Sequence, residues 1–134
     1  MNTPSALDKL IQWARLSDDR NRYLFDLRNG GWTLADIGRV AHLDPSTICR
    51  ATAGLTQGTG AGNNTAAAQL LTWRQLDYRR GELITAACNQ GNTINDIADA
   101  TGMAVTTLYR LRADYLKRRG RAAAHARAVE KAFA

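Results

Sequence analysis

The densest group of side chains with a definite chemistry is cationic. Lys117, Arg118, Arg119 and Arg121 stand together in the stretch LKRRGR near the C-terminus. The formal charge of the 134-residue chain is +6, with a net charge of +1 on residues 1–60 and +5 on the remainder. Clustered guanidinium and ammonium groups favour a polyanionic partner, nucleic acid first and an anionic membrane surface second.

Metal and redox chemistry have little support in the sequence. Cys49 and Cys88 lie outside any Cys-x-x-Cys spacing, and His42 and His125 are each isolated. Because structural zinc needs clustered Cys and His ligands, we expect no metal, no cofactor and two reduced thiols. The N-terminal stretch MNTPSALDKL lacks the pattern of a signal peptide, and no apolar run could span a bilayer. We therefore expect a cytoplasmic location and no membrane partner.

The elements that position these groups are predicted to be helices. The chain has two prolines and 45% apolar residues, is rich in Ala, Leu and Arg, and shows almost no strand-like alternation. Such a composition favours α-helix and supports a folded core. The sequence therefore predicts an all-α fold.

The chain repeats itself at an offset of 60 residues. Residues 6–50 align with residues 66–110 without a gap and share twelve identities in 45 positions. Trp13 and Trp73 fall in register, and we expect both to be core anchors. We interpret the chain as a duplicated unit. The predicted segments are a first unit (1–53), a linker (54–65), a second unit (66–119) and a basic Ala-rich C-terminal tail (120–134).

Each copy is predicted to contain about four helices. Gly30 and Gly91 suit left-handed caps at the ends of the second helices. The predicted ranges of the first two helices are 5–16 and 19–29 in the first copy, and 66–77 and 80–90 in the second.

The third and fourth helices have sequence start signals. Thr33 and Thr93 stand where N-caps belong, ahead of the third helices. The fourth helices begin near Pro45 and Val105, and in the first copy Asp44 can cap the helix while Pro45 takes its first position.

Two segments lie outside these helices. The stretch GLTQGTGAGNNTA between the copies is rich in Gly, Asn and Thr and predicts a flexible linker. Near the C-terminus, Gly120 is expected to break the helix or free an arm. The last segment, AAAHARAVEKAFA, has three alternatives: it packs on the body, pairs with another copy or a protein partner, or frays.

The two adjacent helices of the second copy resemble the helix-turn-helix DNA-binding family, as found in resolvases, transposases and small repressors. In IADATGMAVTTLYRLR, Ala98 supplies the small residue where the helices cross and Gly102 the turn residue with positive φ. The buried apolar residues that the family needs are Ile97, Met103, Leu108 and Leu111.

The first copy departs from this pattern in two places. Gly38 supplies the small crossing residue, but His42 stands where glycine is usual and Ala51 replaces the last large apolar residue. Histidine enters the left-handed region more readily than most residues, so we expect the turn to survive under mild strain.

The resemblance implies that the fourth helix of each copy enters the major groove of double-stranded DNA. Arginine there would contact guanine, Ser and Thr hydroxyls would contact phosphates or bases, and the basic stretch would neutralise phosphates. The implied DNA-binding residues are Ser46, Thr47, Cys49 and Arg50 in the first copy, Thr106, Thr107, Tyr109 and Arg110 in the second, and Lys117, Arg118, Arg119 and Arg121 after it.

The expected function is sequence-specific recognition of double-stranded DNA at the nucleoid, by a small transcriptional regulator of phage or mobile-element type reading a bipartite site. No catalytic domain accompanies the motif, so we expect neither an enzyme nor a small-molecule ligand. Two alternatives stay open: an adaptor that uses helix-turn-helix units to bind protein, and an architectural or recombination accessory factor.

Overall fold

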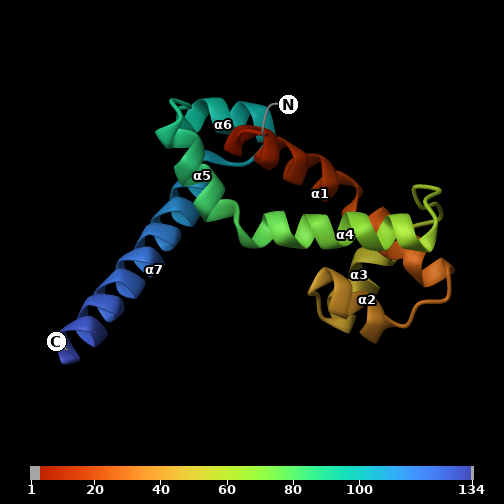
Figure 1. Cartoon of the computed structure of the whole chain (residues 1–134). Helices are drawn as coiled ribbons and strands as arrows, with labels where there is room; N and C mark the ends of the chain where they lie inside the picture. The colour runs from red at the N-terminus through yellow and green to blue at the C-terminus, as the bar shows by residue number, and fades with distance from the viewer. Residues whose placement is uncertain (1–3, 134) are drawn as a thin grey trace. The chain divides into compact units, whose positions relative to one another are not determined.

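The computed structural model describes residues 4–133, and these residues form seven helices and no strand (Figure 1). The predicted all-α class is confirmed. The helices are α1 (Ala6–Asn29), α2 (Leu34–Ala41), α3 (Pro45–Thr52), α4 (Asn63–Tyr78), α5 (Arg80–Asn89), α6 (Ile94–Thr101) and α7 (Val105–Ala132).

The prediction of four helices per copy is wrong for the first copy, which has three. Helix α1 runs unbroken from Ala6 to Asn29, through the predicted gap at residues 17 and 18. No glycine or proline interrupts that stretch, so nothing local ends the helix. In the second copy the corresponding helices are separate, and Arg79 stands between α4 and α5 with φ −94° and ψ 8°.

The predicted break at Gly120 is also wrong, because α7 continues through it to Ala132. A single glycine in a helix interior costs about 1 kcal/mol relative to alanine, and the Ala and Arg residues on both sides are strong helix formers. Residues 120–132 are therefore the end of one 28-residue helix rather than a separate tail.

The contacts divide the chain into two compact units that differ from the two sequence repeats. The central unit holds residues 11–78, and the terminal unit holds residues 79–133 together with 4–10. The predicted boundaries follow the sequence repeat, whereas this division follows packing. Each compact unit thus contains one copy's last helices and a piece of the other copy.

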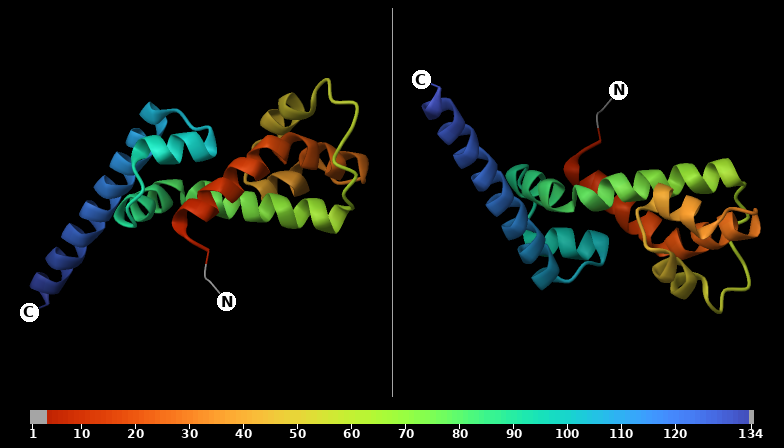
Figure 2. Two further views of the ribbon diagram at one scale, coloured as in Figure 1. Left: turned by 90° about the horizontal axis from the view of Figure 1, so that it is seen from above. Right: turned by 90° about the horizontal axis from the view of Figure 1, so that it is seen from below.

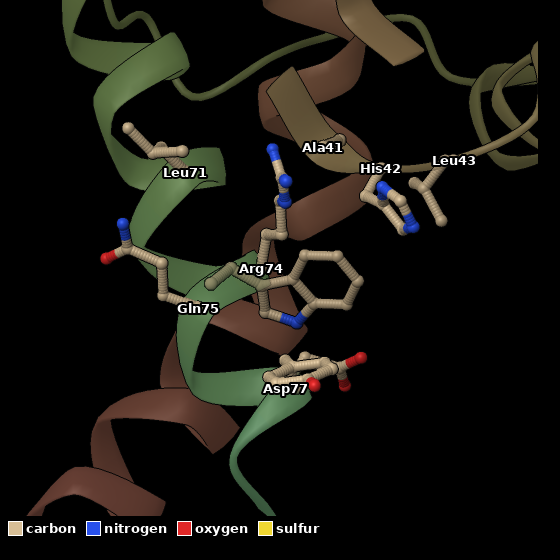
Figure 3. Close-up of a pocket in the computed structure, with 9 residues that line it drawn as sticks. Ala41, His42, Leu43, Leu71, Arg74, Gln75 and Asp77 are labelled. Atoms are coloured by element: carbon tan, nitrogen blue, oxygen red, sulfur yellow. The ribbon is translucent and has the colours of Figure 1, made fainter. Parts of the chain in front are cut away.

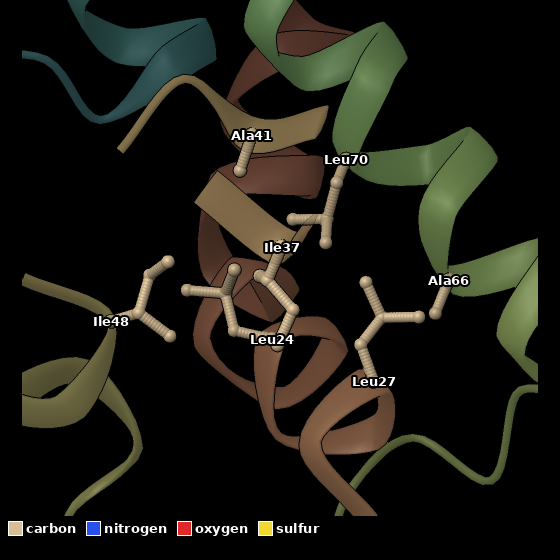
Figure 4. Packing of buried hydrophobic residues seen from close by; sticks show 7 residues of the cluster. All are labelled: Leu24, Leu27, Ile37, Ala41, Ile48, Ala66 and Leu70. Carbon is tan, nitrogen blue, oxygen red and sulfur yellow. The ribbon is translucent and has the colours of Figure 1, made fainter. Parts of the chain in front are cut away.

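The core of the central unit combines helices from both copies. Helices α1, α2 and α3 come from the first copy, and α4 comes from the second (Figure 4). Each fully buried Leu or Ile side chain contributes about 1.5–3 kcal/mol. The buried cluster consists of Leu24, Leu27, Ile37, Ala41, Ile48, Ala66 and Leu70.

The terminal unit buries residues at equivalent positions, 60 residues away. Ala6 and Leu10, from the first turns of α1, stand where Ala66 and Leu70 stand in the central unit, and Leu10 has no exposed surface. The first turns of α1 therefore complete the core of the terminal unit, and α4, the first helix of the second copy, completes the core of the central unit. The other equivalent buried residues are Ile84, Ala87, Ile97 and Leu108.

Helix α4 runs antiparallel to residues 11–29 of α1 inside the central unit (Figure 2). The Trp13 Nε1 donates to Asp77 Oδ1 at 3.0 Å, and the Trp73 Nε1 donates to Ser17 Oγ at 2.9 Å. Positions 13 and 73 are repeat equivalents, and so are positions 17 and 77. In each copy the tryptophan therefore donates to the same position of the other copy. Such reciprocity is the hallmark of an interface with two-fold symmetry. Both tryptophans thus anchor the packing of α1 on α4.

Hydrogen bonds hold the segment between the copies against α1. The Asp26 carboxylate accepts from the backbone N–H and the hydroxyl of Thr59, and Arg22 Nη2 donates to the Gly58 carbonyl. Helix α4 begins at Asn63, three residues before the predicted start of the second unit. Asn63 in turn donates to the Gly30 carbonyl.

Candidate nucleic-acid interface

In the central unit, a tight left-handed turn joins α2 to α3. The predicted N-cap is confirmed, since Thr33 Oγ1 accepts from the Asp36 N–H at 3.1 Å. Helix α2 ends at His42, whose φ of 58° and ψ of 48° lie in the left-handed region. Pro45 opens α3 as predicted, but Asp44, at the N-cap position, makes no side-chain cap hydrogen bond.

The terminal unit joins α6 to α7 through an equivalent turn. Thr93 caps α6 and exchanges hydrogen bonds with Asp96 in a complete capping box. Gly102 ends α6 with φ 76°, and its N–H donates to the Ala98 carbonyl at 2.8 Å. His42 makes the matching bond to the Gly38 carbonyl. The two turns therefore share the left-handed residue and its hydrogen bond, despite the histidine in the first copy.

The glycine at the crossing of α2 and α3 is required by backbone packing. A Cβ atom on Gly38 would lie 2.6 Å from the Leu43 carbonyl oxygen, which is too close for any residue with a side chain.

After the ends of α1 and α5, Gly31 and Gly91 adopt φ values of 91° and 101°. The left-handed residue in the first copy is thus Gly31, and the prediction of Gly30 is off by one position.

Helices α3 and α7 expose the predicted DNA-binding residues in the same pattern. Seven successive positions, 44–50 in α3 and its cap and 104–110 in α7 and its cap, have the same order of exposed, half-buried and buried residues. Ile48 and Leu108 point into their cores. Among the described residues, no hydrogen bond or ion pair involves the side chain of Arg50 or of Arg110. The exposed residues are Ser46, Cys49, Arg50, Thr106, Tyr109 and Arg110, and Thr47 and Thr107 are half-buried.

The basic residues of α7 extend this surface only in part. At 100° per residue, Lys117 and Arg121 lie within about 60° of the face that carries Thr106 and Arg110, over a length of about 22 Å. Arg118 lies to the side, and Arg119 lies on the opposite face, roughly 220° from Thr106. All four basic side chains are exposed.

A single carboxylate tempers the positive charge of this face. Asp114 lines a surface hollow together with Lys117, Arg118 and Arg121. Asp114 stands one turn before Lys117 and Arg118 and two turns before Arg121, so it offsets part of the local cationic potential. The cationic face is therefore strongest beyond Asp114 and at Arg110.

The perturbed titrating groups lie outside this surface. Burial lowers the pKa of Arg20, which lies over the Trp73 ring at 5.0 Å, and the Asp77 charge partly opposes that effect. The hydrogen bond from Arg79 to Glu82, 2.8 Å long, raises the pKa of the guanidinium and lowers that of the carboxyl. Arg20 thus contacts α4 through Trp73, and Arg79 and Glu82 pair across the first turn of α5.

The central unit also contains a cavity of about 480 Å³ between the α2–α3 turn and α4 (Figure 3). Two of its charged side chains have partners within the protein. Arg74 Nη1 donates to the Arg39 carbonyl at 3.2 Å, and Asp77 accepts from Trp13. Both contacts hold α4 against α1 and α2, so these two charged side chains have a structural role at the cavity wall.

Two arginines that the sequence analysis did not single out form hydrogen bonds that join α1 to α3 and α7 to α5. Arg28 Nη1 donates to Thr52 Oγ1 at 2.7 Å in the central unit, and Arg112 Nη1 donates to Cys88 Sγ at 3.6 Å in the terminal unit. The sequence signal was available, because positions 28 and 88, and 52 and 112, are repeat equivalents and each pair of partners contains one arginine.

Across residues 4–133, no helix combines the length and apolarity needed to cross a membrane, and no group of three or more His, Cys, Asp or Glu side chains could hold a metal ion. No protein-family model, curated protein or solved structure matches the chain.

Proposed function

We propose that this chain binds double-stranded DNA in a sequence-specific manner through two tandem helix-turn-helix segments, α2–α3 and α6–α7. Helix α3 and the first turns of α7 would serve as recognition helices. In this proposal the chain is a small transcriptional regulator, of phage or mobile-element type, that reads a bipartite site.

One observation carries the proposal: the two helix pairs match in backbone and in exposed chemistry. Both turns place a left-handed residue at the same repeat position, His42 and Gly102. Both following helices then expose a hydroxyl side chain and, four residues later, an arginine without a protein partner in the described chain.

The side chains suggest a division of labour on DNA. Arg50 and Arg110 can each donate two hydrogen bonds to guanine, worth about 1–3 kcal/mol of discrimination per contact. Lys117 and Arg121 on the same face of α7 can neutralise phosphates and release counterions. Cys49 and Tyr109 occupy the same repeat position with different chemistry, so the two half-sites should differ in sequence.

Two reading units on one chain offset the weak binding of each. A small helix-turn-helix unit reads few bases, and most such proteins bind as dimers. A covalent connection makes the second contact intramolecular and so raises its effective concentration. The chain would then act as a covalent pseudo-dimer.

Selection of bound duplexes from a random DNA pool, at about 150 mM salt, tests the proposal. A gapped two-part motif is expected, and its spacing would report the geometry of the two units. Arg50→Ala and Arg110→Ala should each erase one part of the motif, whereas Arg127→Ala, an exposed charge on α7 outside the predicted site, should erase neither.

The other outcomes separate the alternatives. One short motif would mean that a single unit reads bases, and we expect that unit to be the terminal one. Retention without enrichment would favour architectural binding, which depends on salt but not on sequence. No retention would overturn DNA binding and leave a protein-interaction adaptor.

A further inference from the structure

A guanidinium group ties each recognition helix to the helix that supports it. In the central unit, Arg28 at the end of α1 donates to Thr52, the last residue of α3, at 2.7 Å. The Thr52 hydroxyl donates in turn to the Ile48 carbonyl at 2.8 Å, and only 5% of Thr52 is exposed. The arginine thus binds a hydroxyl whose position the recognition helix itself fixes.

The terminal unit makes the same tie with the partners exchanged. Its arginine, Arg112, stands on the recognition helix α7, and the acceptor, Cys88, stands near the end of α5. Positions 28 and 88 are repeat equivalents, as are 52 and 112. The contact between the two helices is therefore kept while the direction of the hydrogen bond is reversed.

The tie lies behind the surface that would face DNA. Thr52 and Arg112 each follow the exposed arginine, Arg50 or Arg110, by two residues, which places them about 200° around the helix. Apolar core contacts at Ile48 and Leu108 are not directional. A hydrogen bond on the back of the helix can therefore fix the rotation of the front.

The arginine of the terminal unit has a second contact. The Arg112 Cζ lies 5.2 Å from the centroid of the Tyr109 ring, within the range of a cation–π interaction. Tyr109 is exposed and belongs to the predicted DNA-binding surface. In the central unit this repeat position is Cys49, which has no ring to hold. Arg112 thus joins Cys88, on the support helix, to Tyr109, on the recognition surface.

We propose that Arg28 and Arg112 are positioning residues for base recognition. They set the rotation of the two recognition helices, and Arg112 also orients the Tyr109 ring. This inference rests on the proposed DNA binding. It adds that specificity depends on residues that do not touch DNA.

An exchange of partners in the terminal unit tests this role. Arg112→Thr should lower discrimination among single-base variants of the terminal unit's half-site by about tenfold. The double variant Cys88→Arg with Arg112→Thr recreates the arginine–threonine pair of the central unit and should restore most of that discrimination. Recognition of the central unit's half-site should not change in either variant. The thermal midpoint of unfolding should change little, because the tie is a half-exposed hydrogen bond.

Arg127→Thr is the matched control for loss of charge from α7. It should leave base preference unchanged, and any loss of affinity should be the same for all duplexes. NMR of the free chain gives a readout without DNA, because nuclear Overhauser contacts between Arg112 and the Tyr109 ring should be present in the wild type.

The results separate the two proposals. If the wild type enriches a motif and Arg112→Thr keeps the same base preferences, the positioning role is wrong and DNA recognition stands. If both Arg112→Thr and the double variant lose discrimination equally, a reversed tie cannot substitute and the positioning role is likewise overturned. If the wild type enriches no motif, both proposals fall together, even where the NMR contact is found.

Discussion

The central and terminal units use equivalent core positions but differ sharply at α3 and α7. Helix α3 ends at Thr52, and Gly54 follows it with φ 78°, whereas α7 passes the equivalent position and ends at Ala132. The residue equivalent to Gly54 is Asp114, which sits inside α7. The left-handed Gly54 follows the end of α3, whereas α7 continues through Asp114 into its basic residues. The comparison shows how one duplicated core can support two different surfaces.

The largest predicted effect tests the exchange of first helices between the copies. Leu70→Ala should destabilise the central unit by about 2–5 kcal/mol, since it leaves a cavity beside Leu24 and Ile37. Leu10→Ala, the repeat equivalent, should do the same to the terminal unit. Hydrogen exchange should therefore speed up first in α2 for Leu70→Ala and in α6 for Leu10→Ala. Faster hydrogen exchange confined to the sequence copy that carries the mutation would contradict this assignment of Leu10 and Leu70 to the two cores.

The next effect contrasts the two helix crossings. Gly38→Ala should destabilise the central unit by about 1–3 kcal/mol, because its Cβ would meet the Leu43 carbonyl. The equivalent residue in the terminal unit is already alanine, Ala98, so Ala98→Gly is the matched control and should cost no more than about 1 kcal/mol through helix propensity. Urea denaturation of both variants measures the difference, and equal losses would mean that the two crossings are equally open.

A smaller effect distinguishes the two turns. His42→Gly should stabilise the central unit by about 0.5–1 kcal/mol, since a left-handed φ of 58° strains a residue with a Cβ. Gly102→His should destabilise the terminal unit by a similar amount. The urea midpoints of the two variants should therefore move in opposite directions. A loss of stability in His42→Gly would show that the histidine side chain contributes more than its backbone strain costs.

The smallest effect belongs to the Arg79–Glu82 pair. Its repeat equivalents, Asp19 and Arg22, form an ion pair with reversed charges and a longer N–O distance of 3.6 Å. The hydrogen bond from Arg79 lowers the pKa of Glu82, so its contribution is present above the ordinary carboxyl pKa and is lost as the pH falls through the folded pKa. Both side chains are nearly half-exposed, which limits the contribution to about 0.3–0.5 kcal/mol. Glu82→Gln should remove this part of the acid dependence below about pH 4.3, as measured by urea midpoints from pH 7 to 3.

Local signals predicted the helix pairs well. The caps at Thr33 and Thr93, Pro45 at the start of α3 and the turn at Gly102 each depend on interactions within four residues, which a sequence displays directly. The left-handed His42 was also predictable, because the first copy aligns with the second at that turn. The sites on α3 and α7 are exposed as expected, while their binding of DNA stays a prediction.

Signals that depend on distant packing failed. The continuity of α1 and the passage of α7 through Gly120 were missed because a weak helix former is tolerated when its neighbours favour helix. The ties at Arg28 and Arg112 were missed because each joins residues 24 positions apart and reverses its direction between the copies.

The sequence by itself determined the all-α class, the 60-residue repeat and the caps of α2 and α6, which are Thr33, His42, Thr93 and Gly102. These features depend on composition, register and neighbouring residues. Only the tertiary structure decided which copy's first helix completes which core. Ala6 and Ala66, like Leu10 and Leu70, are identical in the two copies, so either residue of each pair fits either core equally well by type. The choice therefore depends on the three-dimensional path of the chain and leaves no mark on the pattern of residues.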